Sequence, residues 1–518
     1  MEEQKIENVV FSKTLSPKEI TQIIVSKNKG NPKIAQMNEA DKYFETENEE
    51  INKKSRVYYD KDRKAIDNPN AYNAKIASNF LRMLVEQKQD YGFAKSFIIK
   101  LSTDKEQEVD LKEDGYGKEW KSFCDDVLFK MSRNLAGQAV NHGLTWCYVW
   151  IDEDGKLKLT EVPAQYIYPE WKDRRHTDLN KLVYHYFVNV YESINPTTKE
   201  YAEYWDDKER ILFNVSNSYT EEAVTKDEEG NFVHSHLTQG KDKLSWDKIP
   251  FICFKGTDDE KTLLSFIKPE IDAYDELSSK SVDGLVDDLD PLLIIKGVSP
   301  DVRDLLEARE LAKMTRTVSL DTDGDAHYIQ AQTAIQAHLQ KMESLRRDII
   351  KFGYGIDYED SRFGGNPNQL VIKSLYQNLD TYMDGLERHF QDFIDDLKYF
   401  FDKWYEMTNK GSFAEAQLYN VRVELDRSMM INQSAQIEDT VKLGQTGVSK
   451  RTLLEFNPVV QDVDMEEERI KEEQKENQQN ELFNFAERTN IENDGEFEPD
   501  EKAEKEKESK DEKLQKSE

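Results

Sequence analysis

The strongest constraint on the fold is an uninterrupted helical pattern over Gln369–Met407. Its apolar residues recur every three to five positions, which places them along one side of a helix: Leu370, Leu375, Leu379, Met383, Leu386, Phe390 and Ile394. At a rise of about 1.5 Å per residue, such a helix extends for tens of ångströms. Other parts of the chain, or neighbouring copies of it, must cover so long a stripe. This pattern favours an elongated subunit.

Two shorter helical patterns precede the long one. The first, over 263–290, carries an apolar stripe and is bounded by Pro269 near its start and Pro291 after its end. The second, over 333–353, has apolar residues three or four positions apart and stops at its terminal glycine. Two long helices would therefore bracket whatever lies between them.

A short β-containing segment lies between these two helices. We expect a strand over 292–298, a helix over 299–314, and a pair of strands, 315–320 with 326–330, around an Asp-rich turn. After the second helix, residues 354–370 form a loop by composition, because their Gly-Gly-Asn-Pro stretch cannot continue a regular helix.

Residues 1–262 predict a mixed α+β region with an antiparallel sheet. Helices are expected after a Ser16-Pro17 cap and over 36–53, 75–88 and 121–142. The aromatic and β-branched run 145–151, a glycine-containing turn and 158–162 form a hairpin. Further strands are expected at 97–99, 182–191, 199–205, 210–215 and 249–254.

The C-terminal part predicts one or two strands over 413–425 and three helices. The helices are expected over 432–443, 449–455 and 464–479, with Ser449 or Thr452 placed to cap the second. Residues 465–518 carry 20 acidic and 10 basic side chains. High charge with little to bury predicts disorder over about 480–518, as a solubilising tail. The fold class expected is α+β, mainly helical.

The charge of the chain narrows its function. With 103 acidic and 71 basic residues, its formal charge is −32. A protein that coats nucleic acid or an anionic membrane needs Lys and Arg to replace counterions, so both roles are disfavoured. No apolar run reaches the length of a membrane span, and the first residues lack a signal-peptide pattern. Cys124, Cys147 and Cys253 are expected to be reduced, mostly buried thiols.

Enzyme motifs are missing from the sequence. The Gly-Lys pairs have no P-loop around them, and neither an HExxH nor a GxSxG motif occurs. The segment from Asp321 to Asp325 resembles the start of a calcium loop, but Ala326 and Gln332 replace the required Gly and Glu. We therefore expect no catalytic site, no bound metal and no cofactor.

Between about 36 and 475 the chain resembles the portal proteins, or head–tail connectors, of tailed double-stranded DNA bacteriophages of the siphovirus type. Short matches carry the resemblance in a shared order: Lys75–Phe80 with Leu84-Val85 and Tyr91-Gly92; His142-Gly143, Tyr148, Asp152–Gly155, Pro163 and Tyr168-Pro169; Ile249-Pro250 and Ile271–Asp275 with Ser278; Phe363–Asn366 before Leu370; Thr446–Ser449, Thr452-Leu453, Asp462, Glu466 and Glu467. Ala94, Ser96 and Pro367 depart from the family pattern, which puts local loop shape in doubt.

The resemblance implies a ring of typically twelve subunits at one capsid vertex, assembled in the host cytoplasm and carried in the virion. Double-stranded DNA would be packaged and ejected through its channel. Implied partners are the terminase large subunit, a head-completion (adaptor) protein, and the major capsid and scaffolding proteins, with no membrane. Implied regions are a wing (1–262, with strands near 413–427), stem helices (263–290 and 333–353), a clip (291–332), a tunnel loop (354–369), a long tunnel helix (370–408), a crown (428–480) and the tail (481–518).

The resemblance also suggests residues for the channel. DNA-facing candidates in the tunnel loop are Gly355, Arg362, Phe363, Gly364, Gly365, Asn366 and Asn368, although an ordinary surface loop is an alternative. Arg346, Arg347 and Lys351 could touch phosphates, or could instead form pairs such as Glu343 with Arg347. Clip docking candidates are Lys296, Ser299, Asp321, Asp323 and Asp325.

Two points stay open at the level of sequence. Asp283, Asp287, Asp288 and Asp290 could line a tunnel or form a solvated outer face. A non-channel scaffold or a DNA-packaging enzyme are alternative functions, the enzyme being disfavoured. If DNA passes through the ring, an acidic chain suits transit, since tight counterion-release binding would hinder sliding.

Overall fold

The computed structural model describes residues 15–59, 63–67, 72–103, 107, 109–111, 113–191, 196–222, 225–226, 232–239, 242–288, 292–296, 325–329, 335–361, 369–427, 440–457, 460, 463 and 465–475. Contacts divide the chain into two units, residues 1–364 with 373–429, and residues 365–372 with 430–518. The fold is a mixed α+β one with antiparallel sheets, as expected for the class.

The larger unit begins with a series of helices. They are α1 (Pro17–Asn28), α2 (Pro32–Phe44), α3 (Glu49–Lys53) and α4 (Phe80–Phe93), with the small hairpin of β1 (Val57–Tyr59) and β2 (Ala65–Asp67) between the last two. The Ser16-Pro17 start of α1 is confirmed, and Ser16 forms a capping box with Glu19. The single helix expected over 36–53 is wrong. It divides at 45–48, where Thr46 has a φ of 65° and Asn48 caps α3.

The helix expected over 75–88 begins later, at Phe80. Ile76, which is inside the expected range, lies before the helix and is 37% exposed. The backbone N–H groups of Ile76 and Ser78 donate instead to side chains of another helix, α7 (Leu264–Asp288). These bonds satisfy donors that would otherwise need a longer α4 or water.

Between residues 144 and 255, the larger unit consists mainly of antiparallel sheets. β4 (Leu144–Ile151) pairs with β5 (Leu157–Val162) and β15 (Phe251–Lys255), so the predicted hairpin is confirmed. A second sheet has the order β10-β9-β8-β7-β6, with bounds β6 (Ile167–Trp171), β7 (Leu179–Val190), β8 (Thr197–Trp205), β9 (Arg210–Asn214) and β10 (Thr220–Glu222). The sequence analysis missed β6, which contains Pro169. The small pairs are β11 (Thr225–Lys226) with β12 (Phe232–Val233) and β13 (Leu237–Gln239) with β14 (Asp242–Leu244).

One helical stretch leads into these sheets. α5 (Gly115–Phe123), a π-helical turn (Cys124–Leu128) and α6 (Phe129–His142) follow one another, and Gly143, with a φ of 85°, ends the stretch as predicted. A 3₁₀ turn (Ala164–Tyr166) precedes β6. Cys124 and Cys147 are free and buried, and Cys253 is free and partly buried.

The long helix is confirmed as α10, Gln369–Met407. Many of its side chains are buried in the larger unit's core, where Phe390 contacts Phe93, Phe97 and Phe254 with ring centroids 5.1 to 5.6 Å apart. After α10, residues 413–425 were expected to be strand. The first part is instead the short helix α11 (Phe413–Ala416), which the Ser412–Glu415 capping box begins. β18 (Tyr419–Glu424) then pairs with β3 (Ile98–Thr103).

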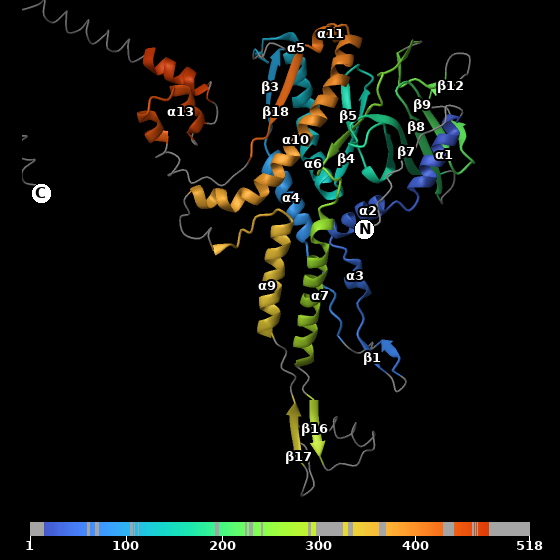
Figure 1. The fold of residues 1–518 in the computed structure, drawn as a ribbon, viewed down its shortest axis with the longest axis vertical. Helices are drawn as coiled ribbons and strands as arrows, with labels where there is room; N and C mark the ends of the chain where they lie inside the picture. Colours follow the sequence, from blue (N-terminus) through green and yellow to red (C-terminus); the bar gives the residue numbers. More distant parts are fainter. Residues whose placement is uncertain are drawn as a thin grey trace, which may run out of the picture. The chain divides into compact units, whose positions relative to one another are not determined.

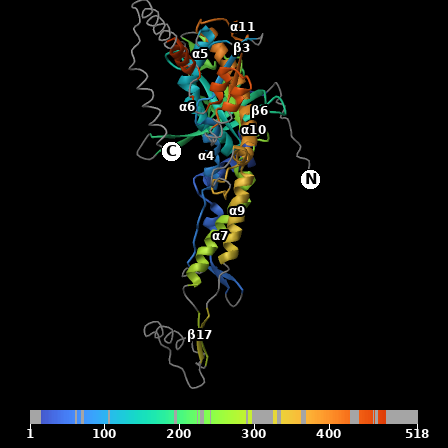
Figure 2. The ribbon, with the colours of Figure 1, turned by 90° about the vertical axis from the view of Figure 1, so that its left-hand side faces the viewer.

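α7 and α9 (Ile335–Phe352) lie side by side, as Figures 1 and 2 both show. Between them in sequence, β16 (Leu292–Lys296) pairs with β17 (Asp325–Ile329). The sequence analysis expected 326–330 to pair with 315–320, but the partner that the structure gives this strand is β16. The expected strand 315–320 and helix 299–314 lie outside the described residues.

The smaller unit is mainly helical where it is described. Residues 440–445 and 465–475 are helical, and α13 (Lys450–Phe456) lies between them in sequence. The side chain of Ser449 accepts a hydrogen bond from the Thr452 N–H, so the predicted cap is confirmed. The predicted tail, 481–518, lies outside the described residues.

Candidate functional site

The α7–α9 pair and the turn that follows α9 contain most of the described candidate residues. Buried Ile271 of α7 and buried Leu345 and Ile349 of α9 belong to the core. A hydrogen bond of 2.9 Å joins Ser281 Oγ and His338 Nδ1 across the pair. The two helices are thus held together by packing and by at least one polar contact.

Another face of α7 carries a row of polar side chains that bind residues from the N-terminal segment. Asp272, Asp275, Ser279 and Asp283 follow one another at spacings of three and four, so they share one side of the helix. Asn48 Nδ2 donates to Asp275 Oδ2 at 2.8 Å, and the Ser78 N–H donates to Asp275 Oδ1 at 2.9 Å. Burial raises the pKa of Asp275, and these hydrogen bonds to Ser78 and Asn48 oppose the rise.

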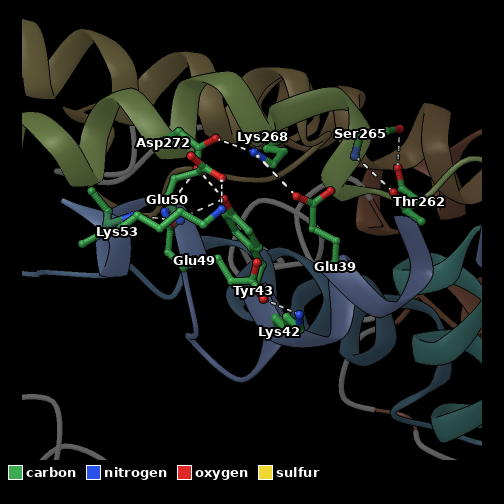
Figure 3. A network of polar contacts seen from close by, with 12 residues as sticks. Glu39, Lys42, Tyr43, Glu49, Glu50, Lys53, Thr262, Ser265, Lys268 and Asp272 are labelled. Atoms are coloured by element: carbon green, nitrogen blue, oxygen red, sulfur yellow. Dashed lines mark hydrogen bonds and ion pairs between the residues drawn. The ribbon is translucent and has the colours of Figure 1, made fainter. Parts of the chain in front are cut away.

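Figure 3 shows the part of this contact nearest the start of α7. The hydroxyl of Tyr43 donates to Asp272, and Lys268 lies 2.7 Å from the same carboxylate and 3.7 Å from Glu39. Ser265 and Thr262 form the helix start, where the Ser265 N–H donates to Thr262 Oγ1 at 3.2 Å. The end of α2 and the segment after it are therefore fastened to the first half of α7.

Asp283 was expected either to line a tunnel or to lie on a solvated face. The structure contradicts both alternatives, because this residue is 5% exposed and fully engaged within the subunit. Its carboxylate lies 2.6 Å from Lys54 Nζ and accepts the Ala74 N–H at 2.7 Å. The side chains of Asp287, Asp288 and Asp290 lie outside the described residues.

The three basic candidates on α9 have different environments. Arg346 has a side chain only 19% exposed and pairs with Glu343, Asp357 and Glu359 at 2.8 to 3.2 Å. Its hydrogen bonds to Glu343 and Asp357 raise its pKa further. This Arg is held within the subunit and cannot also serve as a free phosphate contact.

Arg347 and Lys351 remain accessible. The predicted pair of Arg347 with Glu343 is present at 3.1 Å, but the Arg347 side chain is still 66% exposed. Lys351 is exposed as well. An exposed ion pair such as that of Arg347 with Glu343 is weak.

The tunnel-loop candidates are mostly outside the described residues. This holds for Arg362, Phe363, Gly364, Gly365, Asn366 and Asn368. Gly355 is described, and it is buried rather than DNA-facing. A Cβ placed on it would lie 2.3 Å from Leu84 Cδ2 and 3.0 Å from Gln87 Oε1. We therefore remove Gly355 from the DNA-facing candidates.

Of the docking candidates, two are described. Lys296 and Asp325 are cross-strand partners in the β16–β17 ladder, and Asp325 is exposed. Ser299, Asp321 and Asp323 lie outside the described residues. The two described candidates therefore share one end of a single hairpin.

A large polar cavity of about 1600 Å³ also lies in the larger unit, among residues of α2, β6, β15 and α10. Glu260 on its wall lies 2.7 Å from Lys33 and 2.6 Å from His176. Burial alone would raise the pKa of Glu260, but the hydrogen bonds from His176 and Lys33 lower it to about 2. The sequence analysis gave no signal for this cluster, because its members are far apart along the chain.

No group of three or more His, Cys, Asp or Glu side chains among the described residues could hold a metal ion. None of the helices within the described ranges is long and apolar enough to span a bilayer.

Comparison with known proteins gives a consistent result. Residues 25–480 match the family described as phage portal protein, SPP1 Gp6-like. The portal protein of Bacillus phage SPP1 is 24% identical over 440 residues, which are 83% of this chain and 82% of that protein. The portal protein of Clostridium phage phiCD119 is 24% identical over 374 residues, 69% of this chain and 77% of that protein.

Proposed function

The chain belongs to the SPP1 Gp6-like family of phage portal proteins, and we propose that twelve copies of it close into a ring through which double-stranded DNA is packaged and later ejected. Membership of the family establishes that the chain acts as a channel for DNA packaging at a capsid vertex. It also establishes that the chain is a structural protein and not an enzyme. The single observation that carries the finer proposal is that the family match includes α7, the β16–β17 hairpin, α9 and α10 in order.

Exposed apolar residues on the helix pair support the ring. Leu285 and Val286 of α7 are 47% and 37% exposed, and Leu339 and Phe352 of α9 are 55% and 44% exposed. In a ring each copy contacts two neighbours through two different surfaces, and the arrangement closes when the rotation between copies divides a full turn. We propose that these side chains are covered by the adjacent copies.

The described elements correspond to proposed regions of the ring subunit. The wing is 1–262 with β18, the stem is α7 and α9, and the clip is 291–332 with its hairpin. The tunnel loop is 354–369, the tunnel helix is α10, the crown is 428–480 and the tail is 481–518. This assignment is supported by the packing of α7 on α9 and the pairing of β18 with β3.

DNA transit in this proposal needs weak contacts. The formal charge of −32 per copy disfavours tight binding to a polyanion. Of the three basic candidates on α9, Arg347 and Lys351 are left to touch phosphates, since Arg346 is held by three carboxylates. Residues 362–366 and 368 remain the proposed DNA-facing part of the tunnel loop.

Docking is proposed for the clip. Lys296 and Asp325, together with Ser299, Asp321 and Asp323, would contact the terminase large subunit during packaging and a head-completion protein afterwards. The major capsid and scaffolding proteins would hold the ring at the vertex of the virion. The charged, exposed end of the hairpin at Asp325 supports a surface that exchanges partners.

A packaging reaction tests this function. Capsids assembled from the phage's own major capsid and scaffolding proteins, with and without this chain, are incubated with terminase, ATP and DNA. We expect nuclease-protected DNA only in capsids that contain the chain. A variant that lacks 364–366 should form rings but fill no capsids. If capsids without the chain fill equally well, or if capsids with it never fill, the channel function is wrong and a scaffold is favoured.

A further inference from the structure

The end of α9 contains an unusual residue in a left-handed conformation. The Gly355 N–H donates to the Ile350 carbonyl at 2.8 Å, and the Tyr354 N–H donates to the Lys351 carbonyl at 3.3 Å. This is the Schellman pattern, in which the left-handed position usually holds Gly. Here it holds Tyr354, with a φ of 52°. A bulky residue in this conformation persists only when its surroundings determine it.

α4 supplies those surroundings through Gln87. Its Oε1 accepts the Ile356 N–H at 2.8 Å, and its Nε2 donates to the Ile356 carbonyl at 3.0 Å. One side chain thus satisfies both backbone groups of a residue that is itself only 3% exposed. Because both bonds must form together, they fix the position and the direction of the backbone two residues after Tyr354.

The adjacent residue, Lys88, holds the end of the helix itself. Its side chain is fully buried, and its Nζ donates to the Gly353 carbonyl at 2.5 Å and to the Leu84 carbonyl at 3.3 Å. The last carbonyls of a helix lack partners within the helix, and the N–H groups of the Lys88 amine supply one here. The same Nζ lies 5.1 Å from the ring centre of Tyr382 in α10.

Close packing of the backbone leaves little room for this turn to move. A Cβ on Gly353 would lie 2.5 Å from Leu84 Cδ1, and Leu84 is fully buried. Asn378 of α10 donates to the Lys351 carbonyl at 3.0 Å from another direction. The turn is therefore held between α4 and α10, with most of its polar contacts supplied by Gln87 and Lys88.

We propose that Gln87 and Lys88 are positioning residues of the channel, which fix the direction in which the chain leaves α9 towards its proposed DNA-facing segment. This inference rests on the proposed function. Neither side chain is expected to touch DNA, since Lys88 is buried and both bind backbone groups of 353–356. They act through the turn, and the turn determines where the following residues begin.

The test compares Gln87→Met with a matched control, Glu86→Met, in the full-length protein. Both substitutions keep the length of the side chain on the same helix, but the control removes only a pair with Arg82 whose side chains are 46% and 42% exposed. Gln87→Glu is the conservative variant, because a carboxylate can still accept the Ile356 N–H but cannot donate. Lys88→Met is a second variant. Three properties are measured: ring assembly, hydrogen–deuterium exchange over 353–361, and filling of capsids with DNA.

We expect all variants to form rings. Exchange over 353–361 should rise about ten-fold in Gln87→Met, less in Gln87→Glu, and not in Glu86→Met, which is the scale expected for lost hydrogen bonds. DNA filling should fall in the same order. Should Lys88→Met fail to assemble because of its buried position, the partly exposed Gln87 still provides the comparison.

Two results would overturn the inference. Equal exchange in Gln87→Met and Glu86→Met would show that α4 does not hold the turn. Raised exchange with undiminished DNA filling would show that the turn does not serve the channel. If capsids that contain the wild-type protein do not fill with DNA, the proposed function is wrong, and so is this role in the channel. The exchange comparison still decides separately whether Gln87 and Lys88 hold the turn after α9.

Discussion

Lys54 and Asp283 form an ion pair of 2.6 Å across 229 positions of sequence, with side chains only 14% and 8% exposed. The pair ties the segment after α3 to the second half of α7. Together with Asp272 and Asp275, it turns one face of α7 into an attachment surface for the N-terminal segment. That face is therefore unavailable to DNA, and any channel-facing residues of α7 must lie elsewhere on the helix.

Replacing Asp283 with Ala should destabilise the protein by about 3 kcal/mol, because a largely buried Lys54 loses its partner and the Ala74 N–H loses its acceptor. Glu276→Ala is the matched control on α7, since its pair with Lys280 has side chains 55% and 57% exposed and should matter by less than about 1 kcal/mol. Urea unfolding of both variants measures the difference. Equal losses would contradict the buried role of Asp283.

Gly355→Ala tests whether this glycine is packed or faces DNA. Because its new Cβ would meet Leu84, we expect a loss of about 1–3 kcal/mol in the free energy of unfolding. Gly385→Ala in α10, where only Arg388 comes as near as 3.9 Å, should be neutral or slightly stabilising. If Gly355→Ala leaves the free energy of unfolding unchanged but impairs DNA filling, the sequence-based prediction that Gly355 faces DNA is right.

Lys88 predicts a pH dependence of stability. Burial lowers its pKa to about 7, whereas an unfolded Lys titrates near 10.4. Between these values the folded state binds fewer protons than the unfolded one, so this group makes the free energy of unfolding rise with pH. We expect urea midpoints measured at pH 7 and pH 9 to show a smaller upward trend in Lys88→Met than in the wild type. Identical trends would mean that the pKa of Lys88 is not lowered in the folded protein.

The low pKa of Glu260 predicts that the free energy of unfolding falls at acidic pH. Its folded pKa of about 2 lies below the ordinary value of 4.5, so its contribution is present above about pH 4.5 and is lost as the pH falls towards 2. Glu260→Gln should therefore be less stable at pH 6 and lose less stability between pH 5 and pH 3. Stability measured by urea unfolding at these pH values checks this, and a parallel acid limb in both proteins would contradict it.

Local pattern predicted the elements better than their contacts. The bounds of α10, the Ser16 and Ser449 caps and the β4–β5 hairpin follow from periodicity and capping chemistry within a few residues. The pairing of β17 with β16 could not be predicted in the same way, because strand partners depend on contacts made after a long connection. Two wrong predictions, the single helix over 36–53 and the strand at the start of 413–425, could have been avoided from the sequence. Asn48 is a typical helix cap, and Ser412 with Glu415 has the spacing of a capping box.

The candidate site was predicted only in part. The pair of Arg347 with Glu343 follows from helical spacing and is present. Gln87 and Lys88 lie at the end of the helix expected over 75–88, and nothing in their sequence neighbourhood points to a partner 265 or more residues away. Asp283 was expected to line a tunnel or to lie on a solvated face for the same reason. The burial of a charged side chain can be predicted only when the group that pairs with it is known.

The central claim is that copies of this chain form a closed ring around a channel. Electron microscopy of the purified full-length protein tests it most directly. We predict rings with a central hole and a single rotational symmetry, twelve-fold in the proposed assembly, which persist over a range of salt concentrations. A monodisperse monomer under all salt conditions, or closed particles without a hole, would contradict the account.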